Sequence, residues 1–157
     1  NRRLCSPAFV ARKEAEGWHH VELITGGRRQ PYNASMYLNI PEFREACPCP
    51  LAEMSARTAQ DLGVADGDTL AIASDNGEAC FKVATIDIRY GLIHVDYGWW
   101  HPEWDVHDGR LGGIWESNVN TLTSCSLDQS EALIGTWSYN ALDCMAKKTD
   151  RRLSWEQ

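Results

Sequence analysis

The segment VDYGWWHPEWD at residues 95–105 carries side chains that could bind a ligand or take part in catalysis. Its tryptophan rings and its carboxylates Glu103 and Asp105 are of the types that glycosidases use to hold a sugar and cleave its bond. Nothing in the spacing fixes how far apart these two carboxylates lie, so hydrolysis does not follow from it. Tryptophans at the end of a strand can either fill a core or cover a bound ring.

A second segment, TGGRR at residues 25–29, has the composition of a phosphate-binding turn. Gly26 and Gly27 lack β-carbons, so backbone N–H groups there could approach phosphate oxygens closely. Arg28 could add a bidentate, charge-assisted clamp, and Thr25 could add a hydroxyl. Taken alone, the pentapeptide fits a strand end with a surface arginine pair better, so a pyrophosphate site needs support from the rest of the chain.

The cysteines are expected to be reduced thiols rather than a disulfide framework, because the chain is rich in core-forming residues. Cys47 and Cys49 form C-P-C, which is one residue closer than the usual zinc-binding pair, and no second close pair follows. Cys80 and Cys144 lie among apolar neighbours, so we expect both to be small core residues.

The remaining candidate ligands and nucleophiles form no recognisable pattern. The histidines lack the spacings that metal sites favour, so each is expected to be structural or exposed. Ser124 and Cys125 have no recognisable base partner, which argues against nucleophilic catalysis. We therefore expect neither metal ligands nor catalytic residues in this chain. The histidines are His19, His20, His94, His101 and His107.

Composition and charge limit the possible partners. A formal net charge of −7 disfavours nucleic acid, whose phosphates require a basic face. No apolar run approaches the ~20 residues of a membrane span, and the first residues do not resemble a signal peptide, so no membrane contact is expected. A length of 157 residues suits one domain, and the lack of an initiator methionine suggests a piece of a longer polypeptide. The compartment stays open: cytoplasmic, or exported with the full-length protein.

The clearest local pattern is a helix at residues 56–62. Ser55 can cap its start, an apolar stripe follows, and Gly63 can end it in left-handed geometry. Earlier in the chain, residues 21–25 form an apolar, β-branched run that stops at a glycine pair and predicts a strand. Between these two elements we expect a long proline-rich loop with one helical turn at residues 42–46.

The second half of the chain predicts further strands. Residues 69–74 form an apolar strand that meets a hairpin signal, Asp-Asn-Gly at residues 75–77, before a return strand over residues 78–87. Residues 91–98 and 138–148 add two more strands. Several strands with few helices favour a closed or nearly closed β-barrel.

Several motifs resemble, in order and spacing, those of the molybdopterin dinucleotide-binding domain that forms the C-terminal part of dimethyl sulfoxide reductase superfamily enzymes. The resemblance covers roughly residues 21–147. The matching segments are LITGGRRQPY, NIPEFREACPCPLAEM, AQDLGVADGDTLAIASDNG, YGWWHPE, SNVNTLTS and NALDC. The helix-turn-strand segment also occurs in other double-psi barrels, whereas the complete set is specific to this family.

The resemblance implies a mainly β fold with flanking helices, a six-stranded double-psi β-barrel. Residues 1–157 would form a single molybdopterin dinucleotide-binding domain of a larger enzyme, with flanking segments at residues 1–20 and 148–157. The implied cofactor is the guanine dinucleotide form of molybdopterin, which holds molybdenum or tungsten in the complete oxidoreductase. An iron–sulfur cluster and the metal's protein ligand would lie elsewhere in the full-length chain.

In such an enzyme the domain orients the cofactor while the metal performs the chemistry, so this segment alone is not expected to be catalytic. The implied partners are the remaining domains of the same polypeptide and an electron-transfer subunit. The G-W-W-x-P-E and I-P-x-x-R elements favour the polysulfide reductase, acetylene hydratase and transhydroxylase side of the superfamily. The substrate and the choice of metal stay open.

With this resemblance, TGGRR is interpreted as a cofactor turn. Asn118 and Asn120 carry donors and acceptors on one amide, which suits the mixed edge of a pterin or guanine ring, although asparagine also forms turns. The candidate cofactor-binding residues are Thr25, Gly26, Gly27, Arg28, Ser35, Asn39, Trp99, Trp100, Asn118 and Asn120. Ala34 and Leu38 depart from the family pattern, because histidine and arginine are common at these places, and two polar contacts would then be missing.

Two other functions stay open. A double-psi barrel could act as a protein-recognition module without a cofactor, and it would then need neither TGGRR nor SNVNTLTS. A stand-alone hydrolase using Glu103 and Asp105 would need activity from this segment alone, which we do not expect. A C-x-x-C-x-x-x-C run upstream of Asn1 would support the enzyme.

Overall fold

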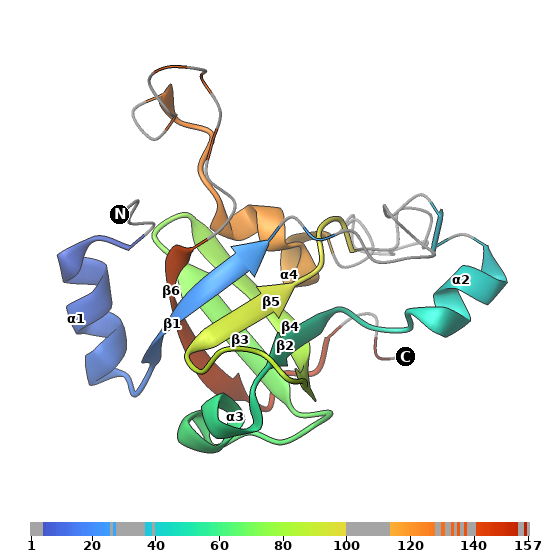
Figure 1. Ribbon diagram of the computed structural model, residues 1–157. Coiled ribbons are helices and arrows are strands. Elements are labelled where there is room, and N and C mark those ends of the chain that lie inside the picture. The colour runs from blue at the N-terminus through green and yellow to red at the C-terminus, as the bar shows by residue number, and fades with distance from the viewer. Residues whose placement is uncertain are drawn as a thin grey trace.

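The computed structural model describes residues 5–25, 27, 37–38, 40–99, 114–127, 130, 133, 135, 137, 141–153 and 156 (Figure 1). Its elements are, in chain order, α1 (Pro7–Ala15), β1 (His19–Thr25), α2 (Pro41–Ala46), β2 (Leu51–Met54), α3 (Ala56–Leu62), β3 (Thr69–Ser74), β4 (Gly77–Thr85), β5 (Leu92–Val95), α4 (Ile114–Ser117), the 3-10 helix η2 (Val119–Leu122) and β6 (Leu142–Thr149). No described helix is both long and apolar enough to cross a membrane.

The six strands close into one barrel in the order β1-β5-β2-β4-β3-β6. Two neighbouring pairs are parallel, β1 with β5 and β2 with β4, and the other pairs are antiparallel. A parallel pair cannot be joined by a tight hairpin, so the chain must cross over between its two strands. The barrel with its flanking helices confirms the predicted fold class, a mainly β, six-stranded double-psi β-barrel.

Alternation along the strands fills the barrel. Successive side chains of a strand point to opposite faces, so every second residue enters the interior. In β1 the pattern places Val21 and Leu23 in the core, and in β5 it places Ile93 and Val95 there. The largest side chain of the cluster that fills the barrel interior is Phe81, from the middle of β4, which is fully buried. One apolar core therefore holds all six strands together.

The predicted helix and hairpin are confirmed. Ser55 caps α3, with its hydroxyl accepting the N–H of Thr58 at 3.2 Å. Gly63 ends the helix with φ of 66°, a left-handed conformation that glycine adopts without a steric penalty. β3 and β4 pair through a register that places Ser74 opposite Gly77, with a two-residue turn between them.

Other element boundaries differ from the sequence predictions. β4 ends at Thr85, two residues earlier than predicted, and the N–H of Thr85 donates to the Asp66 carboxylate at 2.6 Å. β5 stops at Val95, and the chain then turns through Gly98, whose φ is 75°. The sequence patterns did not predict α1 or β2, and the last strand begins and ends slightly later than expected.

The flanking segments pack on the barrel. α1 covers part of it through Phe9, which shares an apolar cluster with Cys5, Ala73 and Met145. At the other end of the chain, Leu153 is buried in a separate cluster against the barrel wall. Figure 1 shows α1 beside β1 and β6, with α2 on the opposite side.

Replacing Phe81 with alanine should lower the free energy of unfolding by about 3–5 kcal/mol, because it removes the largest side chain of the closed core and leaves a cavity. Urea denaturation of the chain, followed by circular dichroism, measures this change. Ile86→Ala serves as the control, since Ile86 is 39% exposed and its truncation should cost about 0.5 kcal/mol or less. Equal losses in both variants would contradict the assigned core.

Candidate functional site

Three strands end at the same end of the barrel. β1 runs parallel to β5, with Thr25 opposite Val95. β3 runs in the same direction, because both β1 and β3 are antiparallel to β6. The C-terminal ends of β1, β3 and β5 therefore meet at one rim, where Figure 1 shows the arrowheads of β1 and β5 side by side. We call this end of the barrel the odd-strand rim.

Two of the predicted cofactor residues lie where β1 reaches this rim. Thr25 is the last residue of β1 and is 1% exposed. Gly27 follows the strand, and its carbonyl oxygen accepts the N–H of Tyr97 at 2.9 Å, which links the turn after β1 to the turn after β5. A β-carbon at Gly27 would lie 2.5 Å from Nε2 of His94, so a side chain here would force the imidazole to move.

Two of the predicted asparagines, Asn118 and Asn120, lie at the same rim. Ser74, at the end of β3, donates its hydroxyl to the carbonyl of Leu122 at 2.8 Å and so fixes η2 on the β3–β4 hairpin. Asn118 is buried and caps η2, its side-chain oxygen accepting the N–H of Asn120 at 3.0 Å. Asn120 is exposed. The structure thus gives Asn118 a turn-forming role and leaves the Asn120 side chain at the surface of the rim.

The first of the paired tryptophans, Trp99, is buried in the domain. This side chain is 2% exposed, and its indole N–H donates to the carbonyl of Cys47 at 3.3 Å. It packs in a cluster with Leu38, Ala71 and Cys80, on the outside of the barrel wall. Trp99 is therefore a packing residue in this chain, and any cofactor contact by it remains a prediction.

Several predicted residues lie outside the described part of the chain, and their role stays a prediction. They are Gly26, Arg28, Ser35, Asn39, Trp100, Glu103 and Asp105, together with the departing position Ala34. Leu38, the other departure from the family pattern, is described and fully buried. Its carbonyl accepts the Nε–H of Arg44 at 3.0 Å.

One group of polar side chains was not predicted from the sequence. Glu53, His94 and Asp96 place one ligand atom each within 4.8 Å of one another. Nδ1 of His94 lies 2.8 Å from Oε2 of Glu53, and both side chains are largely buried. Spacing gave no signal, because Glu53 and His94 are 41 residues apart and meet only through the pairing of β2 with β5.

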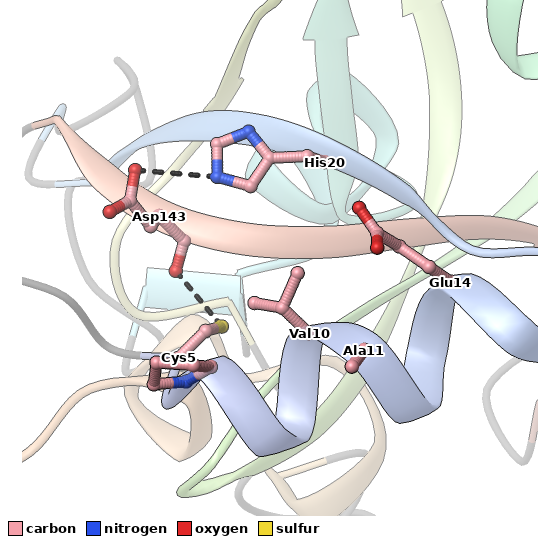
Figure 2. Close-up of a pocket in the computed structure, with 7 residues that line it drawn as sticks. Cys5, Val10, Ala11, Glu14, His20 and Asp143 are labelled. Atoms are coloured by element: carbon pink, nitrogen blue, oxygen red, sulfur yellow. Dashed lines mark hydrogen bonds and ion pairs between the residues drawn. The ribbon is translucent and has the colours of Figure 1, made fainter.

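A groove beside α1 gathers a second set of reactive residue types (Figure 2). It is a cavity of about 500 Å³ lined by Cys5, Glu14, His20 and Asp143, among others. Figure 2 shows Asp143 between the other two reactive groups: its carboxylate faces His20 at 3.5 Å, and its backbone carbonyl accepts the Cys5 thiol at 3.2 Å. The thiol and the imidazole therefore do not form a nucleophile–base pair.

Burial also keeps this thiol protonated. Desolvation, with a smaller contribution from the negative charge of Asp75, raises the pKa of Cys5 to about 11. Because the thiolate is the nucleophilic form, Cys5 is unreactive near neutral pH. Desolvation likewise raises the pKa of Cys80 to about 11 and raises that of Cys144. Their burial confirms Cys80 and Cys144 as small core residues, and both are free thiols.

The closed barrel, with Gly27 and the Asn118–Asn120 segment at one rim, has the architecture of a double-psi β-barrel domain. The chain belongs to the molydopterin dinucleotide binding domain family, whose pattern matches residues 22–136, more than half of its length. This family binds the molybdopterin dinucleotide cofactor of molybdenum oxidoreductases. Membership decides in favour of the cofactor domain over the protein-recognition module.

Known proteins support this assignment. The chain is similar to dopamine dehydroxylase of Eggerthella lenta, with 35% identity over 105 residues, covering 62% of this chain and 10% of that protein. A putative catalytic subunit of dimethyl sulfoxide reductase from Halobacterium salinarum is 26% identical over 110 residues, covering 67% of this chain and 13% of that protein. The chain thus spans about a tenth of the length of these relatives.

A solved structure has the same fold. Acetylene hydratase from Pelobacter acetylenicus superimposes with a TM-score of 0.76 at 21% sequence identity. The match covers 95% of this chain and 21% of that chain. At this identity the likeness concerns the fold alone, and it extends to almost the whole described barrel with its flanks.

The thiols should differ strongly in reactivity. At pH 8 the thiolate fraction of Cys5 is about 100-fold smaller than that of a thiol whose pKa has its ordinary value of 9.0. Iodoacetamide labelling of the folded chain, resolved by mass spectrometry, should therefore modify the exposed Cys125 first, while Cys5 and Cys80 react slowly and faster as the pH rises toward 11. Rapid labelling of Cys5 at pH 7 would disprove its burial.

Replacing Asn118 with alanine should lower the free energy of unfolding by about 1 kcal/mol, because η2 loses its cap. Asn118→Asp keeps an oxygen that can accept the N–H of Asn120, so its stability should stay close to the original. Thermal unfolding of the two variants measures the difference. If Asn118→Asp is as unstable as Asn118→Ala, the amide group makes a further essential contact.

Proposed function

We propose that this chain holds the guanine dinucleotide form of molybdopterin on its odd-strand rim, as the C-terminal domain of a larger molybdenum or tungsten oxidoreductase. The observation that carries this proposal is the common direction of β1, β3 and β5. It brings the turn at Gly27 and the Asn118–Asn120 segment, which the sequence selects independently, to the same end of the barrel.

The residues at the rim fit the chemistry of the cofactor. A pyrophosphate is bound closely by a backbone that carries no side chains, and Gly27 supplies such a backbone at a position where a β-carbon would lie 2.5 Å from Nε2 of His94. Thr25, Gly26, Gly27 and Arg28 would hold the pyrophosphate. The exposed amide of Asn120 could pair with the donor and acceptor edge of a pterin or guanine ring. Ser35, Asn39 and Trp100 would extend the contacts to the rest of the dinucleotide.

When bound, the cofactor supplies the metal centre at which oxygen-atom, hydride or hydroxyl chemistry takes place. This chain would contribute binding and orientation: hydrogen-bond donors for the phosphates and an amide for the ring edge. The remaining domains of the same polypeptide would complete the site, including any iron–sulfur cluster, and a further subunit would exchange electrons. The substrate would be set by those domains, since this chain corresponds to about a tenth of its relatives.

Arg28→Ala in the full-length enzyme should weaken cofactor retention by about 10–100-fold, because a charge-assisted hydrogen bond to phosphate is lost. The measurement is the content of guanine nucleotide and of molybdenum or tungsten after gel filtration. Arg57→Ala is the matched control, since Arg57 lies on α3, at the opposite end of the barrel, with its guanidinium 4.5 Å from the Tyr90 ring centre. Absence of both metal and guanine from the unaltered enzyme would refute the proposal.

A further inference from the structure

Glu53 and His94 face each other on the outer wall of the barrel. They are directly paired in the register of β2 and β5. Their neighbours Met54 and Ile93 belong to the core, so Glu53 and His94 point away from it. Asp96, two residues after His94, continues the same outer face and is 8% exposed.

The contact between the two side chains fixes the orientation of the imidazole ring. Nδ1 of His94 lies 2.8 Å from the Glu53 carboxylate, which is the distance of a direct, charge-assisted hydrogen bond. The side chains are only 23% and 14% exposed, so they are poorly screened by solvent. A carboxylate bound to Nδ1 selects the ring orientation in which Nε2 faces the opposite way.

Nε2 of the oriented ring faces the turn after β1. A β-carbon at Gly27 would lie 2.5 Å from Nε2 and 3.1 Å from Cε1 of His94. The imidazole edge therefore packs against the backbone of the turn itself. The carbonyl of Gly27 also accepts the N–H of Tyr97 at 2.9 Å. Gly27 is therefore held next to the end of β5 by a hydrogen bond and by the ring edge together.

We propose that Glu53 and His94 form a positioning pair that sets the place of the Gly27 turn, and through it the grip of the domain on the cofactor pyrophosphate. This inference rests on the proposed function. His94 acts here as a support for the turn, and Glu53 acts through His94 by fixing its ring. The glycine at position 27 is required because the supporting ring occupies the space of its side chain.

A double-mutant cycle in the full-length holoenzyme tests the pair. The readout is the rate at which guanine nucleotide leaves the protein during dilution, with the unfolding midpoint measured on the same samples. We expect about tenfold faster loss for His94→Ala and a smaller acceleration for Glu53→Gln, which keeps the side-chain shape. Gly27→Ala should also accelerate the loss. In the double variant Gly27→Ala/His94→Ala, the loss should be no faster than in His94→Ala alone, because the collision has been removed.

The chain offers a matched control. His20 also lies near a carboxylate, at 3.5 Å from Asp143, but in the groove beside α1. His20→Ala should leave the rate of cofactor loss unchanged. His94→Asn should restore part of the retention, because its amide can still donate to Glu53, whereas a purely space-filling role would not distinguish it from other small side chains.

Three results would overturn the inference. The first is an unchanged rate in His94→Ala and Glu53→Gln when the unaltered enzyme is fully loaded with cofactor. The second is strict multiplication of the Gly27→Ala and His94→Ala effects, which would show that the two positions are independent. The third is one equivalent of a divalent metal that is lost in Glu53→Gln, because His94 would then be a metal ligand. An unaltered enzyme without guanine or metal would instead refute the proposed function.

Discussion

The parallel pairing of β1 with β5 is the constraint on which the rest of the structure depends. It aligns Thr25 with Val95, so that two segments some seventy residues apart leave the barrel at the same height. Closure then fixes the direction of every other strand, since each one is paired on both sides. A barrel has no free edge along which the register could slip, and its interior side chains would all move to the wrong face if it did. The rim is therefore a consequence of closure.

The polar side chains on the outer face at this rim are stabilised by a hydrogen bond between two of them. Glu53, His94 and Asp96 are taken largely out of water, which is costly for charged groups that find no partner. The direct bond between Glu53 and His94 offsets part of that cost and orders both side chains. A hydrogen-bonded pair in a poorly screened place makes a rigid support, because the bond holds the ring in one orientation. Rigidity here is transmitted to the turn at Gly27, which the ring touches.

Local signals in the sequence predicted the elements that have clear start, stop or turn residues. α3 has a serine cap and a glycine stop, and the β3–β4 hairpin has its Asp-Asn-Gly turn, so both could be found without tertiary information. β2 has only four residues and directly follows Pro50, so no alternation long enough to recognise develops. α1 also begins at a local signal, the capping side chain of Ser6 followed by Pro7, but Phe9 is its only buried residue, so it has no strong apolar stripe and was not predicted.

The site was predictable only in part, for a related reason. Glycine and asparagine favour turns through their own chemistry, so Gly27 and Asn118 could be selected from the sequence as candidate site residues. The bond between His94 and Glu53 depends on the pairing of two strands, and the pairing depends on closure of the barrel. Residue spacing contains no record of it. The role of Gly27 and Asn118 was therefore predicted only through the family resemblance. The pairing of Glu53 with His94 could be recognised only from the fold.

The burial of Leu38 bears on the departure that the resemblance implies at this position. The resemblance implies an arginine, whereas the leucine side chain is fully buried in one cluster with Trp99 and Cys47. A guanidinium could enter that cluster only with a buried partner, because an unpaired charge there is strongly destabilising. Arg44 instead donates to the Leu38 carbonyl from the side, at 3.0 Å. Apolar packing, completed by the indole of Trp99, therefore holds Leu38 and Cys47 against the barrel wall. Trp99 contributes to this packing together with Ala71 and Cys80 of the strands.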